Sequence, residues 1–225
     1  MTDRAIKLIN MVLSHEGGYS SGSEKQTIGD KGRETYRGIS RAYNPSWKGW
    51  QIIDKNKPIK YNAIIHNKNL DDAVKEYYYN SYYLPLKCDK INSLLIAGHL
   101  FCHGVNAGIK TSAKLLQKSI NNVYNVNLTV DGIIGSNTLK YVNGDKIKLL
   151  EQEFIKQRRQ YYNSIARNNP SQKKFLNGWL NRVNKTTKTC SSSFNVLFTS
   201  ANINGIIPKI LSFIYDVVQL LTKKG

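Results

Sequence analysis

Apolar side chains recur at steps of three and four residues along most of this chain, and this spacing constrains its fold more than any other feature of the sequence. Such a pattern gives an α-helix one apolar face, which must be buried against a neighbouring element. The pattern predicts helices over residues 2–14, 69–82, 91–104, 111–122, 136–142, 145–167 and around 175–183. We therefore expect a mainly α fold, a helical globule in which the very apolar helix 91–104 is central.

The stretch from Tyr19 to about Lys60 interrupts this pattern. It is rich in Gly, Ser, Asn and Lys and has no sustained period, which is typical of loops and short strands. It follows directly on the first helix, which we expect Gly17-Gly18 to stop. The sequence thus predicts a loop-rich segment at the exit of that helix, where a functional site would form.

The composition changes again near the carboxyl end. Residues 185–195 are rich in Thr, Lys and Ser, which predicts a linker. Within 196–225, residues 206–221 are largely apolar but carry a polar stripe at steps of three and four, which predicts an amphipathic helix. Such a helix would dock on the protein body or lie on an anionic envelope membrane, and the stripe makes a transmembrane span the less favoured interpretation.

The charge balance points to a polyanionic partner. Lys and Arg number 33 against 15 Asp and Glu, a formal net charge of +18. Nucleic acid, acidic cell-wall polymers and anionic lipid all fit this charge. The basic residues are spread along the chain without any recognisable nucleic-acid-binding motif, so we do not expect nucleic acid as the partner.

The cysteines and histidines indicate neither a disulfide framework nor a metal site. Cys88, Cys102 and Cys190 are an odd number and widely spaced. His99 and His103 stand four residues apart on a predicted helix and could present two imidazoles to one metal. No further ligand lies nearby in the sequence, so we favour buried core histidines and expect no metal. Cys102 lies on the same apolar helix, which disfavours a reactive thiolate.

Glu16 is the carboxylate best suited to chemistry. At the carboxyl end of a helix it faces the negative pole of the helix dipole, and partial burial beside Tyr19 would raise its pKa in the same direction. A carboxyl group kept protonated in this way is what the cleavage of a glycosidic bond requires. A plain helix end followed by a turn is the alternative interpretation of this segment.

A second Gly-punctuated stretch, residues 29–39, follows closely, and we expect it to fold back against the first. Asp30 or Glu34 would then be a second carboxylate and Thr35 could hold a water molecule, unless these residues are solvated turn residues. Aromatic side chains can stack against sugar rings, whose C–H faces are apolar, and the candidates are Tyr19, Tyr36, Tyr43, Trp47, Trp50 and Trp179. Trp47 and Trp50 are favoured because they lie in a loop-like context near the expected cleft, whereas Trp179 at helical spacing is expected to pack in the core.

These motifs together resemble those of a known family. His15-Glu16-Gly17-Gly18-Tyr19, followed by the residues from Asp30 to Ile39, resembles the amino-terminal signature of glycoside hydrolase family 108. The likeness continues through Tyr82–Leu86 and Val105–Gly108, and Val130–Gly135 resembles the peptidoglycan-binding-type region of that family. The resemblance implies a lysozyme-like α+β fold that is mainly helical. It also implies an N-acetylmuramidase of phage endolysin type, which hydrolyses the β-1,4 bond between N-acetylmuramic acid and N-acetylglucosamine without a cofactor.

The resemblance also assigns roles along the chain. It implies Glu16 as the catalytic acid, with Asp30 and Thr35 organising the attacking water. The expected substrate-binding residues are Tyr19, Glu34, Tyr36 and Asn106. We expect a catalytic region at 1–108 and a helical peptidoglycan-binding-type region at 109–184 packed on it, followed by the linker and the C-terminal segment.

Bacterial peptidoglycan is the expected partner of a monomeric enzyme. The sequence starts without a signal-peptide pattern, so we expect synthesis in the cytoplasm and action at the cell wall or periplasm after release by a holin or a secretion route. The alternative function is a cationic wall- or membrane-active protein that acts through residues 196–225. In that case Glu16 would be dispensable.

Overall fold

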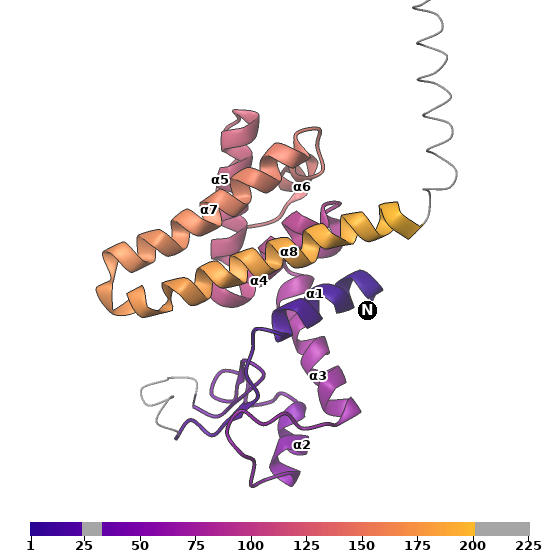
Figure 1. Ribbon diagram of the computed structural model, residues 1–225, viewed down its shortest axis with the longest axis vertical. Helices are drawn as coiled ribbons and strands as arrows, with labels where there is room; N and C mark the ends of the chain where they lie inside the picture. Colours follow the sequence, from indigo (N-terminus) through magenta and orange to yellow (C-terminus); the bar gives the residue numbers. More distant parts are fainter. Residues whose placement is uncertain (24–32, 201–225) are drawn as a thin grey trace, which may run out of the picture.

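The computed structural model describes residues 1–23 and 33–200, with 192–200 described as backbone only. The chain forms two lobes (Figure 1). One, the strand lobe, holds three short strands and helix α2, and the other, the helical lobe, is built from α4 to α8. Helices α1 and α3 lie where the two lobes meet.

The strands of the strand lobe form a small antiparallel sheet in the order β1-β2-β3. Their bounds are Tyr19–Ser20, Thr35–Tyr36 and Ile39–Ser40. Arg37 and Gly38, which join β2 to β3, have φ angles of 51° and 78°. Positive φ at both central residues is the mark of a type I′ turn, whose twist matches that of a two-residue hairpin. The loops and short strands expected after the first helix are confirmed.

The helices largely follow the apolar periodicity. The predicted ones are α1 (Asp3–Leu13), α3 (Lys68–Tyr78), α4 (Leu94–Ala107), α5 (Ile109–Tyr124), α6 (Ser136–Val142), α7 (Ile147–Asn168) and α8 (Leu176–Ser200). Short helical turns also occur, namely the π-helical η2 (Tyr79–Tyr83) and the 3-10 turns η3 (Cys88–Lys90) and η4 (Pro170–Phe175). Helix α2 (Gly49–Lys55) was not predicted, because it is too short to show a period and lies in the stretch expected to form loops and strands. The mainly α fold is therefore confirmed.

Helix α4 is the centre of the core, as its apolar sequence predicted. Its side chains from Ile96 to Gly104 are all buried, and it packs against α1, α5, α7 and α8. Ser93 caps its amino end by accepting a hydrogen bond from the Ile96 N–H at 3.1 Å. A helix surrounded in this way has no solvent face, which explains why polar residues are rare along it.

Helix α8 corrects the prediction of a linker at residues 185–195. These residues continue the helix, because Val183, Thr186 and Cys190 form a buried stripe on one face. The Thr186 hydroxyl also donates to the carbonyl of Arg182 at 2.8 Å, which removes a polar group from competition with the helix. The stripe was not recognised in the sequence because Thr, Ser and Lys dominate the composition of this segment. The amphipathic helix expected at 206–221 lies outside the described residues.

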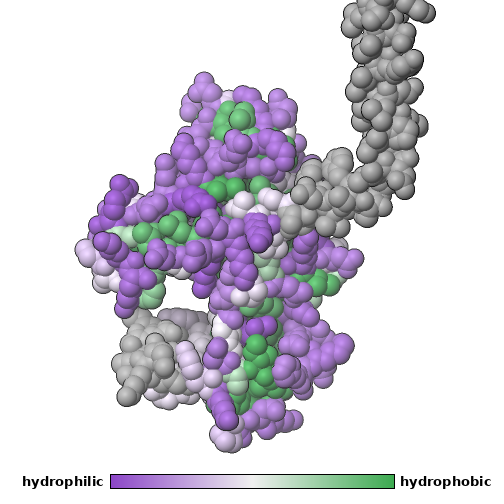
Figure 2. Space-filling view, in the orientation of Figure 1, coloured by the Kyte–Doolittle hydropathy of each residue, from purple (hydrophilic) through white to green (hydrophobic). Residues whose placement is uncertain are grey.

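The visible surface is mainly hydrophilic, and its apolar side chains gather in separate patches (Figure 2). This distribution agrees with the high content of Lys and Arg in the sequence. Among the helices of the described residues, none combines the length and the apolar character needed to cross a membrane.

Candidate functional site

Glu16 lies just beyond α1, where the strand lobe meets the helical lobe. Its backbone N–H donates to the carbonyl of Leu13 at 3.2 Å, so the chain still follows a helical turn at this point. The side chain is only 17% exposed. It faces a cleft of about 430 Å³ that is lined by Glu16, Gly17, Gly18, Tyr19, Ser20, Thr35, Gly38, Ser40, Tyr43, Tyr61 and Asn62.

Gly18 allows the backbone to approach a second segment closely. Its N–H donates to Oδ1 of Asn62 at 2.8 Å, and the next N–H, that of Tyr19, donates to the carbonyl of Ala63 at 2.9 Å. A Cβ atom at Gly18 would lie 2.3 Å from that carbonyl oxygen. Any other residue at this position would therefore push the floor of the cleft apart.

The β2–β3 turn packs directly on the carboxyl group. A Cβ atom at Gly38 would lie 2.7 Å from Oε2 of Glu16 and 2.6 Å from the hydroxyl of Tyr78. That hydroxyl donates to the carbonyl of Arg37 at 2.7 Å and so fixes the turn. The carboxyl group is thus held between α3 and the turn, and this enclosure accounts for its low exposure.

The electrostatics of Glu16 suit an acid. Burial raises its pKa, because a carboxylate loses hydration there, while Arg182 and Arg37 oppose the shift. The direction agrees with the prediction from the sequence, and its main cause is burial. Burial, and to a smaller extent Glu16, also raises the pKa of the Tyr78 hydroxyl well above its ordinary value. The hydroxyl beside the carboxyl therefore stays a neutral donor.

The other predicted residues of this segment lie in different surroundings. Thr35 lines the same cleft as Glu16. Tyr36 is fully buried, and its hydroxyl accepts a hydrogen bond from the Ile65 N–H at 3.1 Å, so it supports the cleft from behind. Tyr19 also lines the cleft, but it is only 5% exposed and its hydroxyl donates to Glu34. Asp30 lies outside the described residues.

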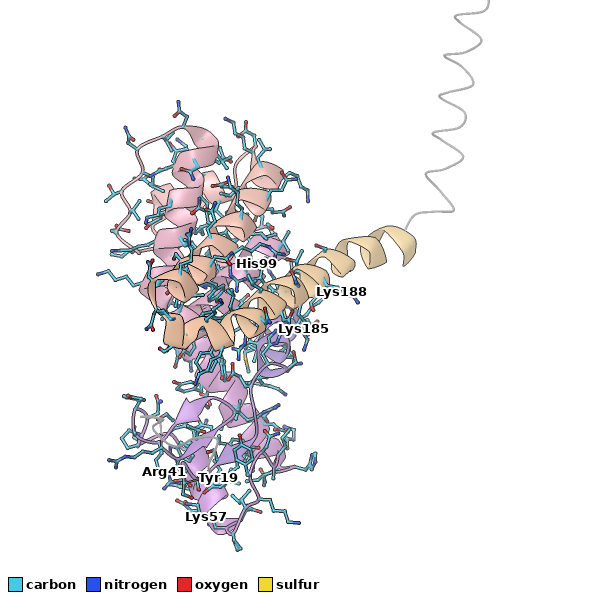
Figure 3. All side chains as sticks on the ribbon, turned by 60° about the vertical axis from the view of Figure 1, so that its left-hand side comes forward. Tyr19, Arg41, Lys57, His99, Lys185 and Lys188 are labelled. Carbon is cyan, nitrogen blue, oxygen red and sulfur yellow. The ribbon has the colours of Figure 1, made fainter. Side chains whose placement is uncertain are left out.

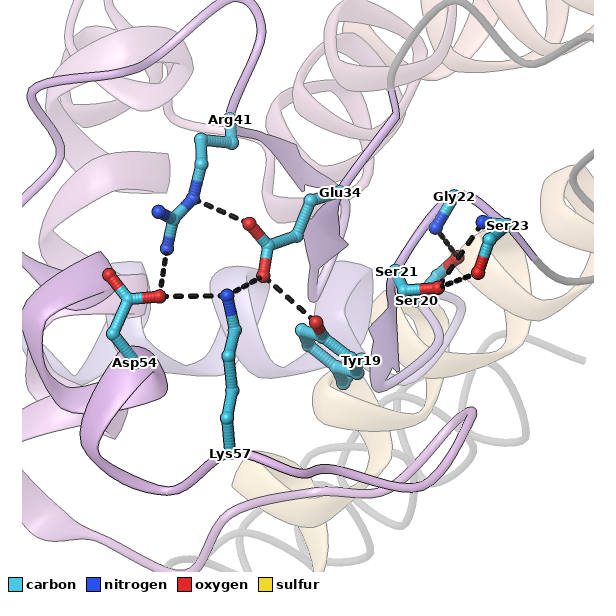
Figure 4. Close-up of polar contacts among 9 residues, drawn as sticks. All are labelled: Tyr19, Ser20, Ser21, Gly22, Ser23, Glu34, Arg41, Asp54 and Lys57. Carbon is cyan, nitrogen blue, oxygen red and sulfur yellow. Dashed lines mark hydrogen bonds and ion pairs between the residues drawn. The ribbon is translucent and has the colours of Figure 1, made fainter.

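Glu34 belongs to an ion network behind the sheet (Figure 4). It accepts a hydrogen bond from the Tyr19 hydroxyl at 2.9 Å and pairs with Arg41 and Lys57, each at 2.7 Å. The same two cations reach Asp54, whose pKa is lowered by its hydrogen bonds to Arg41 and then Lys57. Glu34 is not among the residues that line the cleft. Figure 3 shows Tyr19, Arg41 and Lys57 gathered in the strand lobe.

The aromatic residues near the cleft divide into packing and exposed groups. Trp47 and Trp50 meet edge to face at 5.1 Å, and Trp50 is 3% exposed, so this pair packs in the strand lobe. Tyr43 and Tyr61 line the cleft and are 70% and 48% exposed. These two tyrosines are the rings that a sugar could stack against. Tyr61 was missed at the sequence level, because an isolated Tyr in a loop carries no signal.

Arg182 reaches Glu16 from the helical lobe, and Asn106 contacts Arg182. Asn106, half-buried at the end of α4, donates to the Tyr162 hydroxyl at 2.9 Å. Nη1 of Arg182 on α8 lies 3.3 Å from Oδ1 of Asn106 and 3.5 Å from Oε1 of Glu16. The sequence predicted Asn106 but not Arg182, which lies 166 positions from Glu16 and follows no recognisable motif.

The two histidines of α4 are buried and hydrogen-bonded, as the sequence favoured. His99 contacts Arg158 and the Thr187 hydroxyl, and His103 contacts the Tyr162 hydroxyl at 3.0 Å. Burial, followed by the charge of Arg158, lowers the pKa of both imidazoles well below the ordinary value, so both are neutral. Within residues 1–23 and 33–191, no group of three His, Cys, Asp or Glu side chains is placed to hold a metal.

Comparisons with known proteins find similarity both in sequence and in fold. Residues 9–108 match the family model described as Glycosyl hydrolase 108, and residues 111–184 match the one described as Predicted Peptidoglycan domain. The solved structure of Brucella abortus SagA is similar in fold, with a TM-score of 0.57 at 20% identity over 84% of this chain and 94% of that chain. The search of curated proteins gives no match.

Proposed function

We propose that this chain, whose residues 9–108 match the glycosyl hydrolase 108 family model, is an N-acetylmuramidase whose general acid is Glu16. The two matched regions make it a lysozyme-like glycoside hydrolase that acts on peptidoglycan. The bond that we propose it cleaves is the β-1,4 linkage between N-acetylmuramic acid and N-acetylglucosamine, and the residue that protonates the glycosidic oxygen is Glu16. It also places the enzyme at the cell wall, where this polymer lies.

The enclosed carboxyl group of Glu16 is the observation that carries the proposal. Burial raises its pKa, so the group remains protonated at a higher pH than an exposed Glu does. In the reaction Glu16 gives its proton to the glycosidic oxygen while the bond from that oxygen to the anomeric carbon breaks. The sugar becomes oxocarbenium-like, and water completes the hydrolysis.

We assign the water to the other side of the cleft. Thr35 lines this cleft with its hydroxyl-bearing side chain half-buried, which suits it to hold a water molecule. Asp30 remains the proposed partner that activates this water, on the strength of the sequence alone. Tyr43 and Tyr61 are proposed to stack against the bound glycan.

The test compares the wild type with Glu16→Gln on purified peptidoglycan. The substitution keeps the shape of the side chain and removes the acidic proton, so we expect the rate to fall by about 10²- to 10⁴-fold. New reducing ends measure the rate, and mass spectrometry of the released fragments identifies the terminal sugar, which should be muramic acid. The wild-type rate should fall as the pH rises through the pKa of Glu16.

Glu76→Gln is the matched control. Glu76 lies on α3, is half exposed and pairs with Lys48, so its loss should leave the rate unchanged. Undiminished cleavage by Glu16→Gln would refute Glu16 as the acid. If that variant kept its lytic power without cleaving glycan, the alternative of a cationic protein acting through residues 196–225 would replace the proposal.

A further inference from the structure

A continuous chain of polar contacts runs from the core of the helical lobe to Glu16. It starts at His103 on α4, passes through Tyr162 on α7 and Asn106 at the end of α4, and reaches Arg182 on α8. Arg182 then contacts Glu16. Tyr162 and Arg182 both lie within residues 111–184, the region matched as a peptidoglycan domain.

The hydrogen bonds of this network run in one direction, from Arg182 to His103. Arg182 donates to Oδ1 of Asn106, and the amide nitrogen of Asn106 donates to the hydroxyl oxygen of Tyr162. The hydroxyl hydrogen of Tyr162 is then left for Nδ1 of His103, which is neutral and can accept it. In this order every contact has one donor and one acceptor, so the network restrains the guanidinium beside Glu16.

The aromatic packing of Tyr162 also restrains the chain. Its ring stacks on Trp179 with centroids 5.3 Å apart and meets Tyr161 and His103 edge to face. Tyr162 is 1% exposed, whereas the side chain of Arg182, beside Glu16, is 30% exposed. A rigid interior therefore supports a cation that reaches the reacting carboxyl.

We propose that Arg182 is a positioning residue for Glu16 and that the helical lobe thereby completes the active site. This inference rests on the proposed function of Glu16. Before the proton is transferred, Asn106 holds the guanidinium beside a neutral carboxyl. After the transfer, the same guanidinium faces the carboxylate that has formed, and this stabilises the later state more than the earlier one.

Two cations and several neutral groups face Glu16. Arg182 comes from α8 and Arg37 from the β2–β3 turn, and both favour the carboxylate. The neutral groups are Tyr78 from α3, Tyr82 from η2 and the adjacent His15. The pKa of His15 is lowered to about 4 by burial and then by nearby cations. Removing Arg182 therefore leaves one cation, and Glu16 should hold its proton to a higher pH.

The experiment measures kcat and KM on purified peptidoglycan across the pH range for the full-length chain. In Arg182→Gln we expect the alkaline limb of kcat to move to higher pH and the maximal kcat to fall about tenfold, with KM changed by less than about twofold. Arg182→Lys keeps the positive charge, so its alkaline limb should lie close to that of the wild type. Tyr162→Phe, which removes one link, should lower kcat less than Arg182→Gln does.

Lys188→Gln is the matched control, since Lys188 is an exposed cation farther along α8 (Figure 3). It should behave as the wild type. The inference is overturned if the pH profile of Arg182→Gln coincides with that of the wild type, or if Lys188→Gln shifts it equally. Should Arg182→Gln not fold, an unshifted profile in both Tyr162→Phe and Asn106→Ala would overturn it. Full activity in Glu16→Gln would instead mark a failure of the proposed function.

Discussion

At the scale of single residues, the site depends on close contacts that only glycine permits. Gly18 brings the backbone after Glu16 against residues 62 and 63, and Gly38 brings the β2–β3 turn against the carboxyl group itself. In the sequence both glycines read as turn formers. In the structure they set the distance between the acid and the walls of its cleft.

Gly38→Ala should therefore affect activity more than stability. The new methyl group would meet Oε2 of Glu16 and the Tyr78 hydroxyl at under 3 Å, and alanine is strained at a φ of 78°. We expect cleavage to fall by at least about 10²-fold, as for a misplaced catalytic group, and the free energy of unfolding to fall by roughly 1–3 kcal/mol. Kinetics on peptidoglycan and urea unfolding measure the two effects.

Gly108→Ala is the control for the backbone strain. Its φ is 91°, but a Cβ atom there would meet nothing within 4 Å. This variant should lose a similar stability of about 1–2 kcal/mol and keep its activity. Equal activity losses in the two variants would show that backbone strain, and not the contact with Glu16, is responsible.

At the scale of elements, α8 contacts both lobes. It packs on α4 and α7, and at the same time it places Arg182 beside Glu16. It approaches α4 closely at Gly98, where a Cβ atom would lie 2.5 Å from Sγ of Cys190. The position of Arg182 therefore depends on how closely the two helices pack about two turns away.

Gly98→Ala tests this dependence. The added methyl group would press on buried Cys190 and shift α8, so we expect a loss of about 1–3 kcal/mol in stability together with reduced kcat. Gly178→Ala, in the same α8 but with nothing within 4 Å, should instead stabilise the protein by up to about 1 kcal/mol, because alanine favours a helix. Thermal and urea unfolding compare the pair. A Gly98→Ala protein as stable as Gly178→Ala would contradict the tight packing.

At the scale of the whole molecule, the main feature is the formal net charge of +18. Cations dominate the surface, and several, such as Lys185 and Lys188, follow α8 through the helical lobe (Figure 3). A charge of this size attracts polyanions over a distance that salt shortens. The cell wall, which carries acidic groups, is such a polymer.

Binding to the wall should therefore depend strongly on salt. We expect the inactive Glu16→Gln variant to sediment with purified peptidoglycan at about 0.1 M salt and to be largely released at about 1 M, as the Debye length falls from about 10 Å to about 3 Å. The bound fraction is read from the supernatant. Retention that is unchanged at high salt would assign binding to uncharged contacts such as sugar stacking.

The helices and the motif around Glu16 could be predicted from local sequence. Helical periodicity and glycine turns are local properties, since they reflect the geometry of a few successive residues, and so α1, α4, α5 and α7 could be predicted within a few positions. The direction of the Glu16 pKa shift was also predicted, from the helix end and from burial beside Tyr19. Its main cause, burial between α3 and the β2–β3 turn, is tertiary.

The three-dimensional packing of the chain determines which residues surround Glu16. It placed Glu34, a candidate second carboxylate, in an ion network with Arg41 and Lys57, and it turned a Thr- and Lys-rich linker into part of α8. It also brought Arg182 to Glu16 across 166 positions of sequence. Burial and charge pairing between distant segments depend on how the lobes pack, and no local pattern of residues encodes those distances.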